Sequence, residues 1–422
     1  MKKIFSLLLA AAFTLSAAAC ADKSEKLSVP VALDADGNVD MGVALAYETD
    51  METLLAALDE KITDPNAPVS ENLNAKTLAV FGYLRESYKT KIFAAQQYMH
   101  SKQTEDLVYY TVTGDLPAIK GFDFIFSNLG GERANNEQVD MAIDWHVNSG
   151  GLVAMTWHWN VPRDIGKPEG GRAFYADEIE NFSYINAVTP GTKEYEIIIR
   201  DIDTVAAQLQ RMEKAGVPVL FRPLHEAGGR WFWWGRISRE TVEYECYQKL
   251  WYTIFDRLEN YHKLTNLIWV WNGQDKYMTV HPNTYDIAGI DVYPNRENHS
   301  ALVSDWEKLS KITYGGKMLA LTECGYIPDP GEVFGSDAKW LYYMPWYGDF
   351  VYAPSSPGGT AITDINGTPS VNPDRMSEEF LKSAFADERV VTWKKLPDYK
   401  NTSRELPEHI KAWQMWNDLV NG

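Results

Sequence analysis

The stretch YEIIIRDIDTVAAQLQRMEKAGVPVLFRPL, residues 195–224, contains the pattern that decides the fold. Over Tyr195–Met212, apolar side chains recur at spacings of three and four residues, as in a helix that buries one face. Gly216 and Pro218 end this predicted helix, and the apolar run Val217–Leu224 follows directly. A continuous apolar run next to an amphipathic helix is typical of a strand in a parallel sheet that is covered on both faces.

The same strand-and-helix unit recurs along the chain from about residue 89. A second helical stripe runs over Tyr244–Leu258, with Ser238 as its predicted N-cap. The apolar runs are Lys91–Gln96, Phe122–Phe126, Leu152–Trp157, Val217–Leu224, Leu267–Trp271, Ile287–Tyr293, Met318–Glu323 and Tyr342–Phe350. Eight such units predict a closed (β/α)₈ barrel, a TIM barrel in one domain, rather than an open doubly wound sheet, and no glycine-rich nucleotide loop follows any run. Residues 40–88 are expected to be helical and to pack outside or beneath the barrel.

The composition excludes some classes of partner. Of the 422 residues, 45% are hydrophobic and 23% are charged, so the chain can bury a large core. Its formal charge of −18 would repel phosphate backbones and anionic lipid surfaces, so no nucleic acid partner is expected. Aromatic residues make up 13% of the chain, more flat apolar surface than a core of this size requires. The oligomeric state is not indicated by any of these features.

Residues 1–19 have the organisation of a secretory signal peptide. Two lysines precede the apolar run Ile4–Leu15, and small residues follow it up to Cys20. A cysteine directly after small residues resembles the lipobox of bacterial lipoproteins, with Ala17 where leucine is usual. We therefore expect the mature chain to be exported and Cys20 to be lipidated. An ordinary signal peptide with an incidental cysteine is the alternative.

Lipidation divides the chain into a tether and a folded domain. The polar residues after Cys20 predict a tether over residues 20–40, and residues 41–422 would form the domain. The lipid anchor would be the only contact with a membrane of the bacterial envelope, on its periplasmic or its cell-surface side. Cys246 and Cys324 could pair in an oxidising compartment or remain buried thiols, and the sequence leaves both possibilities open.

Carboxylates follow two of the apolar runs. Glu226 comes two residues after the fourth run and Glu323 ends the seventh, each next to a glycine-containing loop. In a (β/α)₈ barrel the functional residues lie at the carboxyl ends of the strands, and the fourth and seventh strands face each other there. Two carboxylates about 5–5.5 Å apart form the site of a retaining glycosidase, whereas about 6.5–9.5 Å leaves room for a water and inverts the anomeric carbon. The sequence does not give this separation.

Tryptophans gather near the same strand ends. Trp231 and Trp234 follow Glu226 closely, Trp346 follows the start of the eighth run, and tryptophans flank His158 after the third. The C–H faces of pyranose rings stack on aromatic planes, while the sugar hydroxyls need hydrogen-bond partners. We therefore expect Trp231, Trp234 and Trp346 to contact a saccharide, and other tryptophans of the strands to point into the barrel wall.

Three segments resemble motifs of glycoside hydrolase family 26. Arg222–Gly235 resembles the acid/base segment of that family, and Gly289–Pro294 and Leu321–Gly325 resemble its strand-six and strand-seven motifs, in the same order. The resemblance covers about residues 90 to 350. It implies a (β/α)₈ barrel, a retaining mechanism, and activity as an endo-β-1,4-mannanase on mannan, glucomannan or galactomannan, because most members of the family are such enzymes.

The resemblance also implies roles for single residues. Glu226 corresponds to the acid/base and Glu323 to the nucleophile. Tyr293 is implied to hold the carboxylate of the nucleophile in line, and Asp291 corresponds to the acidic partner in the same network. Without the resemblance, a tyrosine at a strand end is often only a packing residue.

The two histidines have two interpretations. The resemblance implies that His225 forms hydrogen bonds near the reacting sugar and that His158 lines the subsite of the sugar that is attacked. Together with Glu226 they could instead bind a metal, but no His-Glu-x-x-His spacing occurs, so neither a metal nor another cofactor is expected. The loop Ala227–Gly229 departs from the family, which commonly has a polar residue there.

Two other functions remain possible from the sequence alone. A hydrolase of the same fold could act on mixed-linkage β-glucan or xylan, since the family includes such members. A non-catalytic glycan-binding lipoprotein is the second alternative, although a pure binder has no reason to retain two facing carboxylates. Endo or exo action, product length and tolerance of galactose branches are not predicted.

Overall fold

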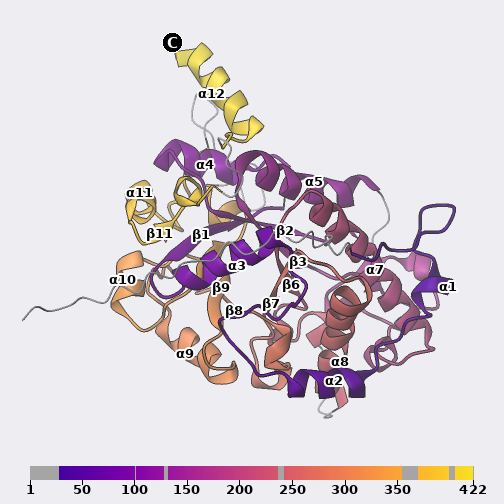
Figure 1. Cartoon of the computed structure of the whole chain (residues 1–422). Coiled ribbons are helices and arrows are strands. Elements are labelled where there is room, and N and C mark those ends of the chain that lie inside the picture. Colours follow the sequence, from indigo (N-terminus) through magenta and orange to yellow (C-terminus); the bar gives the residue numbers. More distant parts are fainter. Residues whose placement is uncertain are drawn as a thin grey trace, which may run out of the picture.

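Parallel strands form a closed barrel at the centre of the molecule (Figure 1). The computed structural model describes residues 28–99, 101–127, 132–235, 242–353, 369–398 and 404–421. The barrel closes where the last strand pairs in parallel with the first, with Phe93 opposite Tyr342. In barrel order the strands are β1 (Ile92–Gln97), β2 (Ile119–Asp123), β3 (Leu152–Trp157), β6 (Val219–Pro223), β7 (Leu267–Trp271), β8 (Ile287–Val292), β9 (Met318–Cys324) and β10 (Tyr342–Pro345). The predicted (β/α)₈ barrel is confirmed.

Helices surround the barrel (Figure 1), and three further short strands lie outside it among the described residues. A two-residue strand, β11 (Val390–Val391), adds to β1, and β4 (Val161–Pro162) pairs with β5 (Arg172–Ala173) in a separate antiparallel sheet. The helices are α1 (Met41–Ala44), α2 (Met51–Glu60), α3 (Ala75–Ser87), α4 (Thr104–Thr113), α5 (Glu132–Ser149), α6 (Tyr184–Ala187), α7 (Lys193–Lys214), α8 (Val242–Asp256), α9 (Val303–Ile312), α10 (Pro330–Gly335), α11 (Glu378–Ala386) and α12 (Glu408–Asn421).

The predicted helix of residues 195–212 is α7. The side chain of Thr192 caps its amino end by accepting a hydrogen bond from the backbone N–H of Tyr195, 3.2 Å away. Its apolar stripe is buried against the barrel, while acidic residues lie in its first turn and basic residues in its last, where they complement the helix dipole. The second predicted helix is α8, which continues as a π-helical turn over Arg257–Tyr261; its predicted cap, Ser238, lies outside the described residues.

The second strand begins and ends three residues earlier than predicted. The run Phe122–Phe126 was expected from its apolar residues, but β2 spans Ile119–Asp123 and includes Lys120. This lysine is buried because its ammonium group forms an ion pair with Asp106 of α4, which is also buried. The buried lysine thus interrupts the apolar pattern from which the strand would be predicted. The eighth strand likewise ends at Pro345, earlier than predicted.

The amino-terminal residues belong to the folded body from residue 28 onward. The N–H of Val29 donates to the carbonyl of His262 at 2.6 Å, and Gln210 of α7 donates to the carbonyl of Val29 at 2.6 Å. Val31 and Val39 are buried. The tether predicted up to residue 40 is therefore too long. Residues 1–27, which include Cys20 and the predicted signal peptide, lie outside the described residues.

Residues 40–88 form three helices, as expected. The last of them, α3, lies next to the amino end of β7, where the N–H of Asn74 donates to the carbonyl of Thr265 at 2.8 Å. Among the described residues, no helix is both long and apolar enough to span a membrane. Cys246 and Cys324 are both buried, and no disulfide joins them, which answers the question that the sequence left open.

Candidate active site

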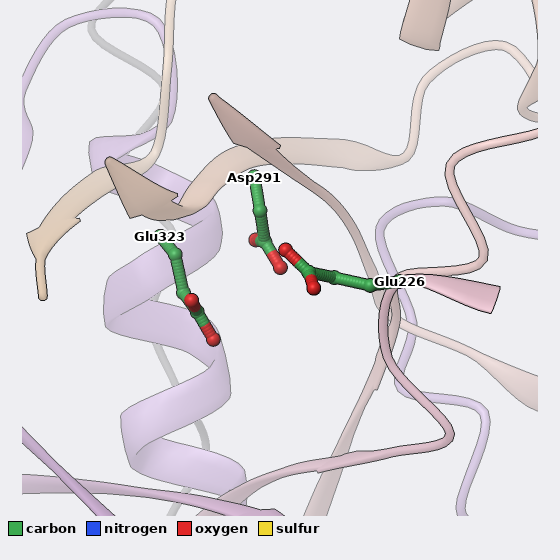
Figure 2. A group of neighbouring side chains, drawn as sticks. All are labelled: Glu226, Asp291 and Glu323. Carbon is green, nitrogen blue, oxygen red and sulfur yellow. The ribbon is translucent and has the colours of Figure 1, made fainter. Parts of the chain in front are cut away.

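Three carboxylates meet at the carboxyl end of the barrel. Asp291 and Glu323 lie near the ends of β8 and β9, and Glu226 lies in the loop after β6. Figure 2 shows the carboxyl groups of Asp291 and Glu226 facing each other, with the side chain of Glu323 beside them. One carboxylate oxygen of each lies within 4.8 Å of those of the other two. The structure thus brings Glu226 and Glu323 together, as their positions after facing strands require.

The loop after β6 holds Glu226 in an unusual backbone conformation. Leu224 and Glu226 both have a left-handed φ of 53°, a region that costs a non-glycine residue about 1–3 kcal/mol. Hydrogen bonds to the loop after β7 hold the strained backbone, because Glu226 N–H donates to the carbonyl of Asn272 at 2.8 Å and Gly228 N–H to that of Gly273 at 2.9 Å. The position of the Glu226 carboxyl is therefore fixed by two neighbouring strand ends.

A buried arginine joins two of the three carboxylates. The guanidinium of Arg222, on β6, forms an ion pair with Glu323 and a second one with Asp291, whose Oδ2 lies 3.0 Å from Nη1. Its Nε also donates to Thr156 Oγ1 at 3.1 Å. Only 3% of this arginine is exposed, so its charge is not screened by water. Burial by itself lowers the pKa of Arg222, but the adjacent carboxylates of Asp291 and Glu323 together raise it above its usual value, which keeps the guanidinium charged.

Asn272, which the sequence analysis missed, connects this network to the loop that carries Glu226. Its amide donates to Asp291 Oδ1 at 3.1 Å and to the hydroxyl of Thr322, and its oxygen accepts the N–H of Glu226 at 3.0 Å. A Cβ at Gly289 would lie 2.3 Å from Thr322 Cγ2, so only glycine leaves room for this contact. An asparagine one residue after a strand has no distinctive sequence signal.

The electrostatics of the cluster give its two glutamates different protonation states. Burial raises the pKa of Glu226, and the negative charges of Asp291 and Glu323 raise it further. Hydrogen bonding with the nearby carboxyl of Asp291 also favours the protonated form of Glu226. Burial and Asp291 raise the pKa of Glu323 as well, but by less, because the charge and hydrogen bond of Arg222 and the hydrogen bond of Tyr293 favour its ionised form. The cluster therefore favours the proton on Glu226 and the negative charge on Glu323.

Three carboxylates could in principle bind a divalent cation, and their oxygens are close enough to do so. Both oxygens of Glu323 are already hydrogen-bonded, one to Arg222 and the other to Tyr293. Asp291 is bonded to Arg222, Asn272 and Thr322. A cation would have to displace these donors and lie beside the guanidinium charge, so the arrangement suits proton transfer and nucleophilic attack better than metal binding.

A family model matches residues 69–363, which include every residue of this cluster, and its description is glycosyl hydrolase family 26. The chain belongs to this family. The strand-six and strand-seven segments on which the resemblance in sequence rests supply Asp291, Tyr293 and Glu323 at the carboxyl end of the barrel, and the acid/base segment supplies Arg222 and Glu226.

Relatives of this family 26 chain carry mannanase names. Mannan endo-1,4-beta-mannosidase B of a Piromyces species is 40% identical over 244 residues, which are 57% of this chain and 40% of that protein. The mannan endo-1,4-beta-mannosidase of Thermothelomyces thermophilus is 31% identical over 364 residues, 82% of this chain and 68% of the relative. A crystal structure of a β-mannanase from a symbiotic protist of the termite Reticulitermes speratus, complexed with a gluco-manno-oligosaccharide, has a TM-score of 0.66 at 29% identity and covers 79% of this chain and 98% of that chain. This chain thus spans less than half the length of the Piromyces relative.

Two aromatic residues of the family 26 chain hydrogen-bond directly to its glutamates. The hydroxyl of Tyr293 donates to Glu323 Oε2 at 2.5 Å, and the pKa of Tyr293 is raised by burial of its hydroxyl and by the nearby carboxylates, so it remains a donor. The indole of Trp231 donates to Glu226 Oε2 at 2.9 Å. Trp231 and Tyr293 are 47% and 40% exposed, so each offers ring surface to a ligand while its polar atom holds a carboxylate.

The predicted histidines lie beside this cluster and contact each other. Nε2 of His225 lies 3.2 Å from Nε2 of His158. Burial lowers the pKa of His225 strongly, and the neighbouring His158 ring and the charge of Arg222 lower it further, which favours the neutral form of the His225 ring. Nδ1 of His158 is hydrogen-bonded to Asp123, which ends β2. Asp123 is not among the predicted site residues, because it lies inside the predicted second strand, whereas β2 ends at it.

The two remaining tryptophans differ in exposure. Trp346 is half-buried after β10 and lies beside the ring of His158, with centroids 6.0 Å apart, so it can contact a ligand. Trp234 is completely buried, stacks on Phe232 and donates its indole N–H to the carbonyl of His225 at 2.8 Å. The expectation that Trp234 contacts a saccharide is therefore wrong. It supports the backbone of His225 instead.

Proposed function

We propose that this protein is a retaining endo-β-1,4-mannanase that hydrolyses mannan, glucomannan or galactomannan. The observation that carries the mechanism is the separation of its glutamates, since oxygens of Glu226 and Glu323 within 4.8 Å fit the spacing of about 5–5.5 Å between the carboxyl groups of retaining enzymes. The choice of mannan is supported by the printed names of the Piromyces and Thermothelomyces relatives and by the gluco-manno-oligosaccharide bound to the termite protist enzyme.

In the first step, the ionised carboxylate of Glu323 attacks the anomeric carbon of the sugar. The glycosidic C–O bond breaks, and protonated Glu226 gives its proton to the departing oxygen. The product is a glycosyl ester on Glu323 and one shortened saccharide. The hydrogen bonds of Arg222 and Tyr293 keep Glu323 ionised and fix its direction before the attack.

In the second step, a water replaces the leaving group. Esterification has removed the negative charge of Glu323, so the pKa of Glu226 falls and its carboxylate can take a proton from this water. The water attacks the anomeric carbon from the side that the leaving group vacated, and the ester bond to Glu323 breaks. Two inversions give overall retention, and Glu226 is protonated again for the next cycle.

The aromatic side chains around the cluster would bind the sugar rings. Trp231 has half of its surface exposed next to Glu226, and Trp346 is half-buried next to His158. Stacking of pyranose faces on these rings would align the chain of sugars across the carboxylates. Endo action is supported by the printed names of the relatives, which are mannan endo-1,4-beta-mannosidases.

Hydrolysis of defined polysaccharides tests the substrate. We expect rapid release of reducing sugar from galactomannan such as locust bean gum, and oligosaccharides of mixed length early in the reaction, because an endo enzyme cuts within the chain. Lichenan and xylan serve as the comparison polymers. A higher kcat/KM on either of them would contradict the mannanase assignment, and binding without hydrolysis would indicate the glycan-binding alternative.

Two substitutions separate the roles of the glutamates. We expect Glu323→Ala to lower hydrolysis of all substrates by several orders of magnitude, because no nucleophile remains. We expect Glu226→Ala to retain much more activity on a 2,4-dinitrophenyl mannobioside than on mannan, because that leaving group needs no proton. Each variant is the control for the other. Equal losses of Glu226→Ala on both substrates would contradict its role as the acid.

The pH profile of Tyr293→Phe tests the charge of the nucleophile. Hydrolysis needs ionised Glu323, so activity falls as the pH drops through the pKa of this residue. The hydroxyl of Tyr293 lowers that pKa, and its removal should raise it. We expect the acid limb of kcat/KM to move to higher pH. The matched control is Tyr314→Phe, at an exposed tyrosine before β9, where the profile should not change. An acid limb that stays in place in Tyr293→Phe would refute this role.

The proposal also includes export and a lipid anchor. The signal-peptide pattern of residues 1–19 and the cysteine that follows small residues support cleavage before Cys20 and its acylation, which would hold the enzyme at the bacterial envelope. Mass spectrometry of the mature amino terminus from an expressing cell decides the point. We expect a diacylglyceryl mass on Cys20, and a mature chain that starts elsewhere would contradict it.

A further inference from the structure

Asp123 is a buried carboxylate that the two-glutamate mechanism does not use. It ends β2, and its side chain has no exposed surface. Its Oδ1 accepts the backbone N–H of His158 at 3.0 Å, and its Oδ2 lies 2.5 Å from the ring Nδ1 of the same residue. A carboxylate that accepts both bonds fixes the place of His158 after β3 as well as the orientation of its ring.

The second ring nitrogen of His158 contacts His225, a residue that follows a different strand. Nε2 of His158 faces Nε2 of His225 at 3.2 Å, with the two rings nearly perpendicular at 77°. Aromatic rings enclose the pair, among them Phe232, whose centroid lies 5.4 Å from His158 and 5.0 Å from His225. The other ring nitrogen of His225, Nδ1, is buried and has no hydrogen-bond partner among the described residues.

These contacts allow one direction of hydrogen bonding when both rings are neutral. An ionised carboxylate only accepts, so the proton of His158 must lie on Nδ1 and its Nε2 must carry a lone pair. The contact with His225 is then a hydrogen bond only if His225 carries its proton on Nε2. Nδ1 of His225 then carries a lone pair and no proton. For a buried nitrogen without a partner, an unsatisfied lone pair costs less free energy than an unsatisfied N–H.

We propose that Asp123 is a positioning residue that sets the direction of the hydrogen-bond chain Asp123–His158–His225, and so presents one fixed arrangement of donors and acceptors beside Glu226. Because His225 directly precedes Glu226 in the strained loop, the state of its ring affects the residue that carries the catalytic proton. The catalytic consequence rests on the proposed function, whereas the direction of the chain does not depend on any substrate.

The wild-type protein allows a direct test of this direction. Long-range ¹H–¹⁵N spectra of the imidazole rings, recorded at a pH where both rings are neutral, distinguish a protonated ring nitrogen from one with a lone pair. Single His→Gln variants assign the signals. We expect the proton of His158 on Nδ1 and that of His225 on Nε2. A proton on Nε2 of His158 would overturn the proposal, and this measurement stands even if the protein does not hydrolyse mannan.

The variant Asp123→Asn should reverse the chain. Its single oxygen can still accept the backbone N–H of His158, but its amide N–H₂ then faces Nδ1, which must become the acceptor. The proton of His158 moves to Nε2, and His225 must accept it and hold its own proton on the unpartnered Nδ1. We expect this reversal in the spectra, together with a loss of kcat/KM on mannan of about 10- to 100-fold, the range found for residues that orient metal-ligating histidines.

A matched control separates this effect from the loss of a buried charge. Asp286, before β8 at the amino end of the barrel, also accepts two hydrogen bonds, from the N–H groups of Val69 and Trp269, each at 2.8 Å. Asp286→Asn should leave both ring tautomers and kcat/KM on mannan close to those of the wild type. Unchanged tautomers in Asp123→Asn, or losses of activity equal to those of the control, would refute the proposal. If Asp123→Asn does not fold, the wild-type spectrum decides.

Discussion

The guanidinium of Arg222 is the interaction on which the rest of the site depends. It is almost fully buried and is bonded to the carboxylates of Asp291 and Glu323, so that it joins β6, β8 and β9 at one end of the barrel. Without this charge, a second negative carboxylate so near the first would be costly in a site of low polarity. With it, Glu323 can remain ionised while Glu226, which lacks such a partner, takes up the proton. The two glutamates therefore differ in their preferred protonation state because Glu323 is bonded to a guanidinium and Glu226 is not.

The parallel barrel makes this arrangement possible because it brings the ends of distant segments together. The groups of the cluster lie in the last residues of largely apolar strands or in the loops just after them, so their polar atoms lie at the end of the barrel core rather than within it. Asn272 links the loops, since it bonds to Asp291 as well as to the backbone of Glu226. The hydrogen bonds to Asn272 hold the backbone of Glu226 in its strained left-handed conformation. A loop without these hydrogen bonds would relax.

The barrel and both glutamates could be predicted because two simple rules agree at these positions, the apolar period of the strands and the location of functional groups at strand ends. The prediction was wrong where a polar residue is buried for a reason that lies elsewhere in the chain. Lys120 in the second strand forms an ion pair with Asp106 of a helix, so the strand is not apolar throughout. The second strand is therefore predicted three residues too late, and Asp123 falls inside it instead of at its end. Trp234 could not be placed, because the direction of a side chain in a loop has no period.

The amino-terminal residues reach the barrel at the end opposite the carboxylates. Val29 is bonded to His262, just before β7, and to Gln210, near the end of α7, and both positions lie where the strands begin. Attachment of the protein to a solid support close to Val29 would therefore leave the reactive end turned toward the bulk liquid. A long, stiff polymer could then approach from any side without first meeting the support.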